Sequence, residues 1–294
     1  MRDDTFPVAC CPPTFPTFEG MRGKAKRRIK RTLIGLAAFY LASGTVLYLV
    51  QDLLFFHPKK LPSSHRFQFE HPFTELNIPI EERNLNVVQF HTPAPNRKGI
   101  VLYFHGNMRN IERYANQAPL FTQNGFDVWM VDYPGFGKST GKRTEEVMYD
   151  DARLLHAMAL KEVSTDSIVI YGRSIGTGVA SYLAAHQPCQ QLILETPYYS
   201  IEAIAKHYAP IFPVKWLMNY RFPIYEYLPQ VKAPVTILHG TRDEIIPYRQ
   251  AQRLSAIKGV ELLTIPNGKH NNLSSAPLFQ QTLSRLLTRQ APSR

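Results

Sequence analysis

The sequence has 294 residues, of which 44% are hydrophobic, and a formal net charge of +11. This length predicts one catalytic-sized domain of about 230 residues behind an N-terminal extension. Only one of the three cysteines, Cys189, lies beyond residue 31. A disulfide bond within the globular part and a CxxC-type metal site there are therefore excluded.

The first 31 residues combine proline with basic side chains. They carry eight Lys or Arg residues against three Asp or Glu residues, and most of the positive charge lies in the run GKAKRRIKR. Residues 1–31 therefore predict a disordered basic tail. A nucleic-acid or nuclear-localisation patch is the alternative for such a run. The apolar segment that follows favours a membrane instead, so we expect no nucleic-acid partner.

Residues 32–51, TLIGLAAFYLASGTVLYLVQ, contain no charge and predict a transmembrane helix. At a rise of about 1.5 Å per residue, this run is long enough to cross a hydrocarbon layer of about 30 Å. Seven basic residues closely precede the run and three closely follow it, which predicts a cytoplasmic N-terminus and a periplasmic or lumenal domain. A cleavable secretory signal is the alternative, because Ala42-Ser43-Gly44 resembles a cleavage site.

The remaining residues, 52–294, predict an α/β domain. Prolines interrupt the segment up to about residue 80, which we interpret as a connector with little regular structure. Apolar runs between turn residues then predict strands, and most of them are separated by stretches with helical spacing. The expected strands are 86–92, 99–106, 126–133, 167–172, 191–196, 234–240 and 260–266, and the expected helices are 111–123, 144–162, 175–187, 247–257 and 276–289. This alternation predicts a mostly parallel sheet covered by helices on both faces.

The segment at about 197–233 interrupts this alternation. It is rich in tyrosine and proline and contains Trp216. A structureless loop of this length is uncommon in a compact domain, so we predict a small lid of short helices. Ordinary packing of aromatic side chains against the sheet is the alternative.

A G-x-S-x-G motif, Gly172 to Gly176, follows an apolar strand-like run and precedes a helix-like run. On such a tight strand-to-helix turn, the hydroxyl of Ser174 is held clear of the sheet as a nucleophile. The same turn directs the backbone NH of Ile175 toward an oxyanion at the attacked carbonyl. The alternative is a helix-capping serine in a glycine-rich turn.

A serine nucleophile requires a base, and the base requires a carboxylate that holds it. Asp243 follows the strand-like run PVTIL, and His270 follows VELLTI. The chain order Ser174, Asp243, His270 is the order expected of α/β-hydrolases. Glu244 and Glu195 are the alternative acids, although a structural role is expected for Glu195.

The second oxyanion donor is expected in the loop that contains His105-Gly106-Asn107-Met108. The backbone NH of Asn107 is the preferred donor, and that of Met108 is the alternative. His105 itself, like His239, precedes glycine at a strand end and is expected to form hydrogen bonds within a loop.

A nucleotide-binding loop is the competing interpretation of GFGKST, residues 135–140. A P-loop requires a glycine five residues before Gly137, and Asp132 occupies that position. We therefore expect no nucleotide, and neither a metal nor an organic cofactor is needed.

Five motifs, YFHGN, VDYPGFGKSTG, YGRSIGTG, HGTRDEIIP and PNGKH, occur in this order behind the apolar N-terminal run. Together they resemble the membrane-anchored α/β-hydrolases of the bud-emergence type, which are related to the serine aminopeptidase-like branch. The resemblance covers about residues 50–290. It implies an α/β-hydrolase fold with Ser174 as nucleophile, Asp243 as acid and His270 as base. The sequence departs from this family at Met108 and Arg109, which narrow the mouth of the site or add charge beside the oxyanion loop.

These features predict a membrane serine hydrolase that cleaves an ester or thioester through an acyl-enzyme. The bilayer and a small acyl or lipid substrate are the expected partners, because an aromatic lid and a membrane tether favour an apolar substrate. A serine peptidase that uses the same triad is one alternative. A non-catalytic interaction protein that retains the fold is the other.

Overall fold

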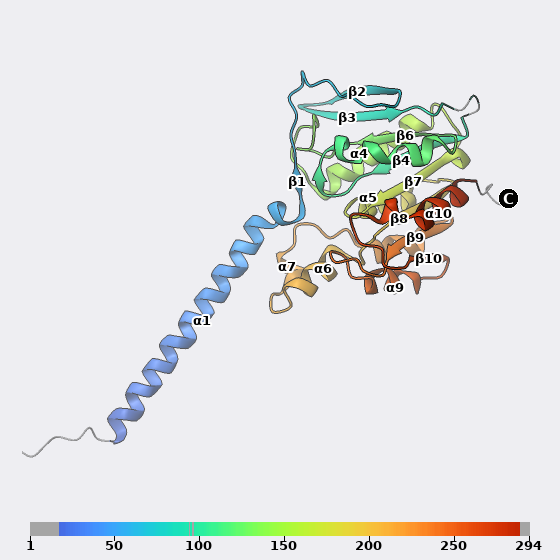
Figure 1. The fold of residues 1–294 in the computed structure, drawn as a ribbon. Helices are drawn as coiled ribbons and strands as arrows, with labels where there is room; N and C mark the ends of the chain where they lie inside the picture. Colours follow the sequence, from blue (N-terminus) through green and yellow to red (C-terminus); the bar gives the residue numbers. More distant parts are fainter. Residues whose placement is uncertain (1–17, 94, 96, 289–294) are drawn as a thin grey trace, which may run out of the picture. The chain divides into compact units, whose positions relative to one another are not determined.

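The computed structural model describes residues 18–93, 95 and 97–288 of a chain that divides into two compact units, residues 1–49 and 50–294. Helix α1 (Phe18–Phe55) forms the described part of the first unit and its last residues belong to the second (Figure 1). Its sequence contains no proline and is rich in alanine, leucine, lysine and arginine, which are strong helix formers. The hydroxyls of Thr32 and Thr45 donate hydrogen bonds to backbone carbonyls one turn earlier.

The start of α1 corrects the predicted disordered tail. Residues 18–31 are helical, because their basic side chains favour a helix and the prolines of the N-terminus all precede residue 18. Residues 1–17 lie outside the described residues. Within α1, the stretch Ala25–Phe55 is long and apolar enough to cross a membrane, and an apolar window of 18 residues within it is not buried. This stretch contains the predicted span, residues 32–51.

The second unit is built around an eight-stranded sheet with the strand order β10-β9-β8-β7-β4-β6-β3-β2. Neighbouring strands from β10 to β6 are parallel, whereas β3 pairs antiparallel with both β6 and β2. The strands are β2 (Phe73–Ile80), β3 (Arg83–Phe90), β4 (Gly99–Phe104), β6 (Phe126–Val131), β7 (Ile168–Arg173), β8 (Gln191–Glu195), β9 (Val235–Gly240) and β10 (Val260–Ile265). A small parallel pair is formed by β1 (His57–Pro58) and β5 (Met108–Arg109).

Helices cover both faces of this sheet (Figure 1). The main helices are α2 (Ile111–Tyr114), α3 (Pro119–Thr122), α4 (Glu145–Ala159), α5 (Gly176–His186), α9 (Arg249–Ser255) and α10 (Pro277–Thr288), and the 3-10 turns are η1 (Ala115–Gln117), η2 (Thr165–Ser167) and η4 (Leu273–Ser275). One core lies between the sheet and α4, α5 and α9, and a second core lies between the sheet and α2, α3 and α10. The α/β-hydrolase fold with a mostly parallel sheet is therefore confirmed.

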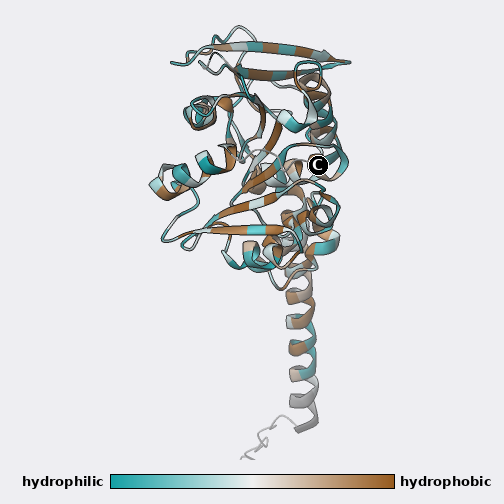
Figure 2. Ribbon diagram, turned by 90° about the vertical axis from the view of Figure 1, so that its right-hand side faces the viewer, coloured by the Kyte–Doolittle hydropathy of each residue, from teal (hydrophilic) through white to brown (hydrophobic). Residues whose placement is uncertain are grey.

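Successive residues of the central strand β4 point into opposite cores. Ile100, Leu102 and Phe104 enter one core, and Val101 and Tyr103 enter the other. This strict alternation follows from the period of two residues in a strand. Because both faces are buried, the parallel strands are continuous apolar runs, which Figure 2 shows as mostly brown ribbons.

Two local predictions are wrong. Residues 73–80 were expected in an irregular connector, yet they form β2, the edge strand that pairs along its whole length with β3. Pro79 obscures the strand pattern in the sequence, but an edge strand tolerates proline because one of its sides needs no partner. The expected helix 111–123 is broken into α2, η1 and α3, and Pro119 begins the last of these pieces.

The predicted lid segment folds as four short helical pieces between β8 and β9. They are α6 (Ile201–Tyr208), α7 (Val214–Leu217), α8 (Ile224–Tyr227) and the 3-10 turn η3 (Leu228–Gln230). Ser200 caps α6, because its hydroxyl accepts a hydrogen bond from the Ala203 amide at 3.0 Å. Tyr198 and Phe222 are buried against α5, so the segment packs directly over the helix that follows the G-x-S-x-G turn.

Candidate active site

Ser174 occupies the turn between β7 and α5. Its φ of +52° lies in the left-handed region, which residues other than glycine rarely adopt. Two backbone hydrogen bonds hold this conformation: the Ser174 amide donates to the Glu195 carbonyl at 2.9 Å, and the Thr177 amide donates to the Ser174 carbonyl at 3.0 Å. The strained turn therefore fixes the direction of the Ser174 side chain.

The two glycines of the motif allow this turn to form. A Cβ atom on Gly176 would lie 2.1 Å from the Phe104 carbonyl oxygen, and one on Gly172 would lie 2.7 Å from the Thr177 Cα. Neither distance leaves room for a side chain. Glycine at these positions brings the start of α5 against the ends of β4 and β7, as the motif predicts.

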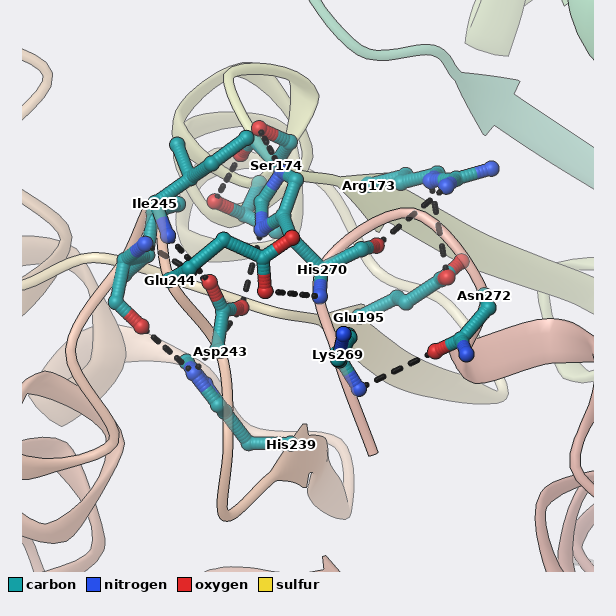
Figure 3. A network of polar contacts seen from close by, with 12 residues as sticks. Arg173, Ser174, Glu195, His239, Asp243, Glu244, Ile245, Lys269, His270 and Asn272 are labelled. Atoms are coloured by element: carbon teal, nitrogen blue, oxygen red, sulfur yellow. Dashed lines mark hydrogen bonds and ion pairs between the residues drawn. The ribbon is translucent and has the colours of Figure 1, made fainter. Parts of the chain in front are cut away.

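The structure brings Ser174, His270 and Asp243 into one hydrogen-bonded chain (Figure 3). His270 Nε2 lies 3.1 Å from Ser174 Oγ, and His270 Nδ1 lies 2.8 Å from Asp243 Oδ2. Each residue lies in a loop directly after β7, β10 or β9, so the three meet at the carboxyl edge of the sheet. Ser174 and His270 are buried, and the Asp243 side chain is fully shielded from solvent.

Asp243 is held as an ionised acceptor. Its Oδ1 accepts hydrogen bonds from the amides of Ile245 and Ile246 at 2.9 and 2.7 Å, and His239 Nε2 lies 3.3 Å from Oδ2. Burial raises the pKa of this carboxyl, but hydrogen bonds from His239, His270 and the Ile246 amide outweigh burial and hold its pKa well below the ordinary value. A carboxylate in this state can orient the His270 imidazole and stabilise its protonated form.

Two backbone amides beside Ser174 are available as oxyanion donors. Within the described part of the chain, the amides of Ile175 and Asn107 donate to no protein group. The loop that carries Asn107 passes close to the serine, because a Cβ on Gly106 would lie 3.6 Å from Ser174 Cβ. The alternative donor, the Met108 amide, is already engaged by the Tyr114 hydroxyl at 3.3 Å.

The loop around Asn107 is held by residues distant in the chain. The Asn107 side chain donates to the Phe55 carbonyl at 3.0 Å, and the Asn107 carbonyl accepts from the His57 amide at 2.9 Å. Met108 and Arg109 form the short strand β5, and Arg109 is exposed with a φ of +62°. The connection after α1 therefore supports the proposed oxyanion loop, a contact that no sequence motif indicated.

A second buried polar cluster lies beside the triad and was missed from the sequence (Figure 3). Arg173 Nε lies 3.4 Å from Glu195 Oε1, Arg173 Nη2 donates to the His270 carbonyl at 3.4 Å, and the Tyr171 hydroxyl donates to Glu195 Oε2 at 2.5 Å. Burial lowers the pKa of Arg173, but the nearby Glu195 charge outweighs it and keeps the guanidinium protonated. Arg173 therefore ties the serine turn to the histidine loop.

The alternatives weighed from the sequence occupy other positions. The Glu195 carboxylate faces Arg173 and Tyr171 rather than the His270 imidazole, and Glu244 Oε2 accepts a hydrogen bond from the His270 amide at 3.4 Å. His105 is fully buried against Asp132 at 3.2 Å and the Gly106 carbonyl at 2.7 Å. Of the three acids Asp243, Glu244 and Glu195, Asp243 is the one that contacts the His270 imidazole.

Comparison with known proteins finds similar sequences and structures. A family described as "Serine aminopeptidase, S33" matches residues 95–228. The α/β hydrolase domain-containing protein aho-3 of Caenorhabditis elegans is 30% identical over 207 residues, which cover 68% of this chain and 60% of that protein. The chain thus spans less than two thirds of this curated relative.

Solved structures share the fold. Est1E from Butyrivibrio proteoclasticus superposes with a TM-score of 0.60 at 20% identity, covering 74% of this chain and 98% of that one. The Pyrococcus furiosus esterase Pf2001 gives a TM-score of 0.60 at 17% identity, covering 81% and 99%. The chain therefore has the α/β-hydrolase fold. Its predicted resemblance to the serine aminopeptidase-like branch of the α/β-hydrolases is confirmed.

The lowered pKa of Asp243 predicts how its contribution to stability depends on pH. Because the folded pKa lies below the ordinary value of 3.8, the ionised carboxylate stabilises the fold above that pH, and this contribution is lost as the pH falls through the folded pKa. We expect the difference in unfolding free energy between the wild type and Asp243→Asn to narrow as the pH is lowered from about 6 to about 3. Urea titrations at several pH values measure this difference in unfolding free energy. A difference that stays constant or widens as the pH falls contradicts a lowered pKa for Asp243.

Proposed function

We propose that this chain is a membrane-anchored serine hydrolase that cleaves an ester or thioester of an apolar acyl group. The observation that carries the proposal is the continuous chain of hydrogen bonds from Ser174 through His270 to Asp243. A hydroxyl, an imidazole and a buried carboxylate in this order form a nucleophile, a base and an orienting acid.

In the proposed acylation step, Ser174 Oγ attacks the carbonyl carbon of the substrate while its proton passes to His270 Nε2. The Asp243 carboxylate stabilises the resulting imidazolium through Nδ1. The oxyanion accepts hydrogen bonds from the amides of Ile175 and Asn107. When the tetrahedral intermediate collapses, the bond to the leaving alcohol or thiol breaks, and His270 returns its proton to that group.

Deacylation repeats the same steps with water. His270 removes a proton from the water molecule, whose oxygen attacks the acyl carbon on Ser174. Collapse then releases the carboxylic acid, and the proton returns from His270 to Ser174 Oγ. The residues named here suffice for both steps.

The lid segment supports an apolar acyl substrate. Tyr198 is fully buried and donates a hydrogen bond to the Ile175 carbonyl at 3.2 Å, so the lid contacts the residue next to the nucleophile. Phe222 and Ile224 are also buried beside α5. These buried side chains hold the lid against the serine turn, and the tyrosine-rich, apolar composition of the lid favours an acyl chain or a lipid over a charged substrate.

A serine peptidase is the second candidate, because the matching family is described as a serine aminopeptidase. Capture of a free peptide amine needs an available carboxylate, and the lid segment 197–233 contains only Glu202 and Glu226. Glu226 is already engaged by Arg221 at 3.3 Å and by the Tyr225 hydroxyl at 2.8 Å. Because Glu226 already has these partners, it is not available to bind a peptide amine. This favours an ester over a peptide as the substrate.

The membrane part of the proposal rests on the length and composition of the stretch Ala25–Phe55. Seven basic residues just before the uncharged run and three just after it favour a cytoplasmic N-terminus and a hydrolase unit on the periplasmic or lumenal side. A chain that spans the bilayer stays in the membrane pellet after alkaline carbonate extraction, whereas release into the supernatant contradicts the span.

Replacing the nucleophile provides the main functional test. We expect Ser174→Ala to lose labelling by a fluorophosphonate probe and to lower ester hydrolysis by about 10³- to 10⁶-fold. Ser181→Ala is the matched control, because Ser181 is buried in the same helix α5 and has no role in the proposed reaction. No labelling of the wild type supports a non-catalytic protein instead, and equal labelling of the wild type and Ser174→Ala means that another residue is the reactive nucleophile.

Separate substitutions of Asp243 and of its neighbour Glu244 test which of the two carboxylates is the acid of the triad. Asp243→Asn retains the shape of the side chain but loses its charge, and we expect kcat to fall by about 10³- to 10⁴-fold. Glu244→Gln keeps an acceptor for the His270 amide, so its kcat is expected to stay within about threefold of the wild type. Steady-state hydrolysis of a soluble p-nitrophenyl ester measures both. A larger loss in Glu244→Gln would reassign the acid.

A further inference from the structure

The end of α6, the loop after it and α7 expose large apolar side chains. Trp216 is 83% exposed, Ile211 is 72% exposed and Tyr208 is 59% exposed. We call residues 208–216, from the last residue of α6 to Trp216 in α7, the lid tip. The helices α6 and α7 lie side by side (Figure 1). Tryptophan is usually mostly buried, and neighbouring exposed apolar side chains mark a surface that contacts another phase or molecule.

Two exposed lysines lie in and beside the lid tip, and the lid's two acids, Glu202 and Glu226, lie outside it. Residues 203–225 contain Lys206, Lys215 and Arg221 and no Asp or Glu, and both lysines are exposed. Aromatic side chains beside lysines are typical of segments that lie in the interface of an anionic bilayer. The composition therefore fits a lipid surface as the occupant of this face.

The segment directly after the lid tip is hydrogen-bonded to the residue at which the uncharged run ends. Gln51, the last residue of that run, donates from Nε2 to the Leu217 carbonyl at 3.2 Å and accepts from the Asn219 amide at 2.7 Å. Leu217 directly follows Trp216. Because the polypeptide leaves the hydrocarbon near Gln51, the residues bonded to it lie at the depth of the lipid headgroups.

The neighbouring end of α1 is fixed to the hydrolase unit. Asp52 pairs with Arg143 at 3.3 Å, and Phe56 is buried with its ring 4.9 Å from that of Tyr220, which lies between α7 and α8. These contacts hold the region around Gln51 against the lid segment. Together with the bonds from Gln51, they place the segment that follows the lid tip beside the end of α1.

The lid tip also contacts the loop that carries the proposed acid. The Tyr208 hydroxyl donates to the Ile245 carbonyl at 2.8 Å, and the Ile245 amide donates to Asp243 Oδ1 at 2.9 Å. Ile245 is itself 44% exposed. The lid tip is thus joined through the exposed Ile245 to the carboxylate of the triad.

We propose that the lid tip inserts into the lipid–water interface of the bilayer that α1 crosses, so that an acyl substrate reaches Ser174 directly from the lipid phase. Trp216, Ile211 and Tyr208 supply the inserted surface, and Lys206 and Lys215 bind anionic headgroups. The inference rests on the proposed membrane span and deepens the proposed function by naming where its substrate enters.

The two tryptophans of the chain allow a direct test. Trp129 is 2% exposed in the core and Trp216 is 83% exposed. The full chain with Trp129→Phe is reconstituted into phosphatidylcholine–phosphatidylglycerol vesicles, with and without brominated phosphatidylcholine. We expect the brominated lipid to quench Trp216 emission and iodide in the water to have little effect. If iodide quenches the Trp216 emission and the brominated lipid does not, the proposal is overturned.

A matched variant controls this measurement. In Trp216→Phe the remaining Trp129 is shielded by the core, so brominated lipid should leave its emission unchanged. If Trp129→Phe does not fold, the difference between the wild-type and Trp216→Phe emission reports Trp216 instead. Neither readout requires catalysis, so a chain that hydrolyses no ester fails the proposed function without affecting this test.

Kinetics test the entry route. We expect the double variant Ile211→Ser and Trp216→Ser to lower kcat/KM about tenfold for a long-chain ester carried in vesicles, because it weakens interfacial contact. The same variant should hydrolyse a short water-soluble ester at the wild-type rate. Leu160→Ser, which changes an exposed leucine at the end of α4, serves as the control. An equal loss on both esters, or no loss on either, overturns entry from the lipid phase.

Discussion

The site depends on the left-handed backbone of Ser174. A φ of +52° is unfavourable for serine, and it persists because hydrogen bonds to β8 and α5 hold the residue on both sides. In this conformation the hydroxyl faces the His270 imidazole rather than the helix backbone. The proposed chemistry requires this turn, and the glycines at 172 and 176 give the neighbouring strand and helix room to close around it.

The two buried carboxylates near the Ser174 turn, Asp243 and Glu195, belong to separate clusters. Asp243 is hydrogen-bonded to His270, whereas Glu195 pairs with Arg173 and accepts a hydrogen bond from the Tyr171 hydroxyl. Each buried carboxylate has a cationic or hydrogen-bonding partner, as burial of an ionised group requires. The separation gives the imidazole a single carboxylate partner, and Arg173 still reaches the backbone of the histidine loop.

The seven strands β3, β4, β6, β7, β8, β9 and β10 and the positions of Ser174, Asp243 and His270 after three of them were predictable from the sequence. Apolar runs and turn residues are local signals, and the carboxyl ends of parallel strands meet at one edge. The strand β2 was missed because Pro79 and the preceding prolines mask its alternation, while its pairing with β3 is antiparallel and lies at the edge of the sheet.

Contacts between distant segments were not predictable. The pair Arg173 and Glu195 belongs to different strands, and the bonds from Gln51 to Leu217 and Asn219 join residues more than 160 positions apart. No local pattern specifies such partners, because each depends on the completed fold. The helical start of α1 at Phe18 was missed for another reason: the proline-rich composition of the N-terminus was extended to residues whose own side chains favour a helix.

Trapping the acyl group on the protein tests the central claim most directly. The full chain is mixed with a p-nitrophenyl ester, quenched in acid during the first turnovers, digested and analysed by mass spectrometry. The account predicts that the peptide containing Ser174 gains the mass of the acyl group and that this adduct is absent from Ser174→Ala. An acyl group on another residue, or product release with no adduct at any time, would contradict it.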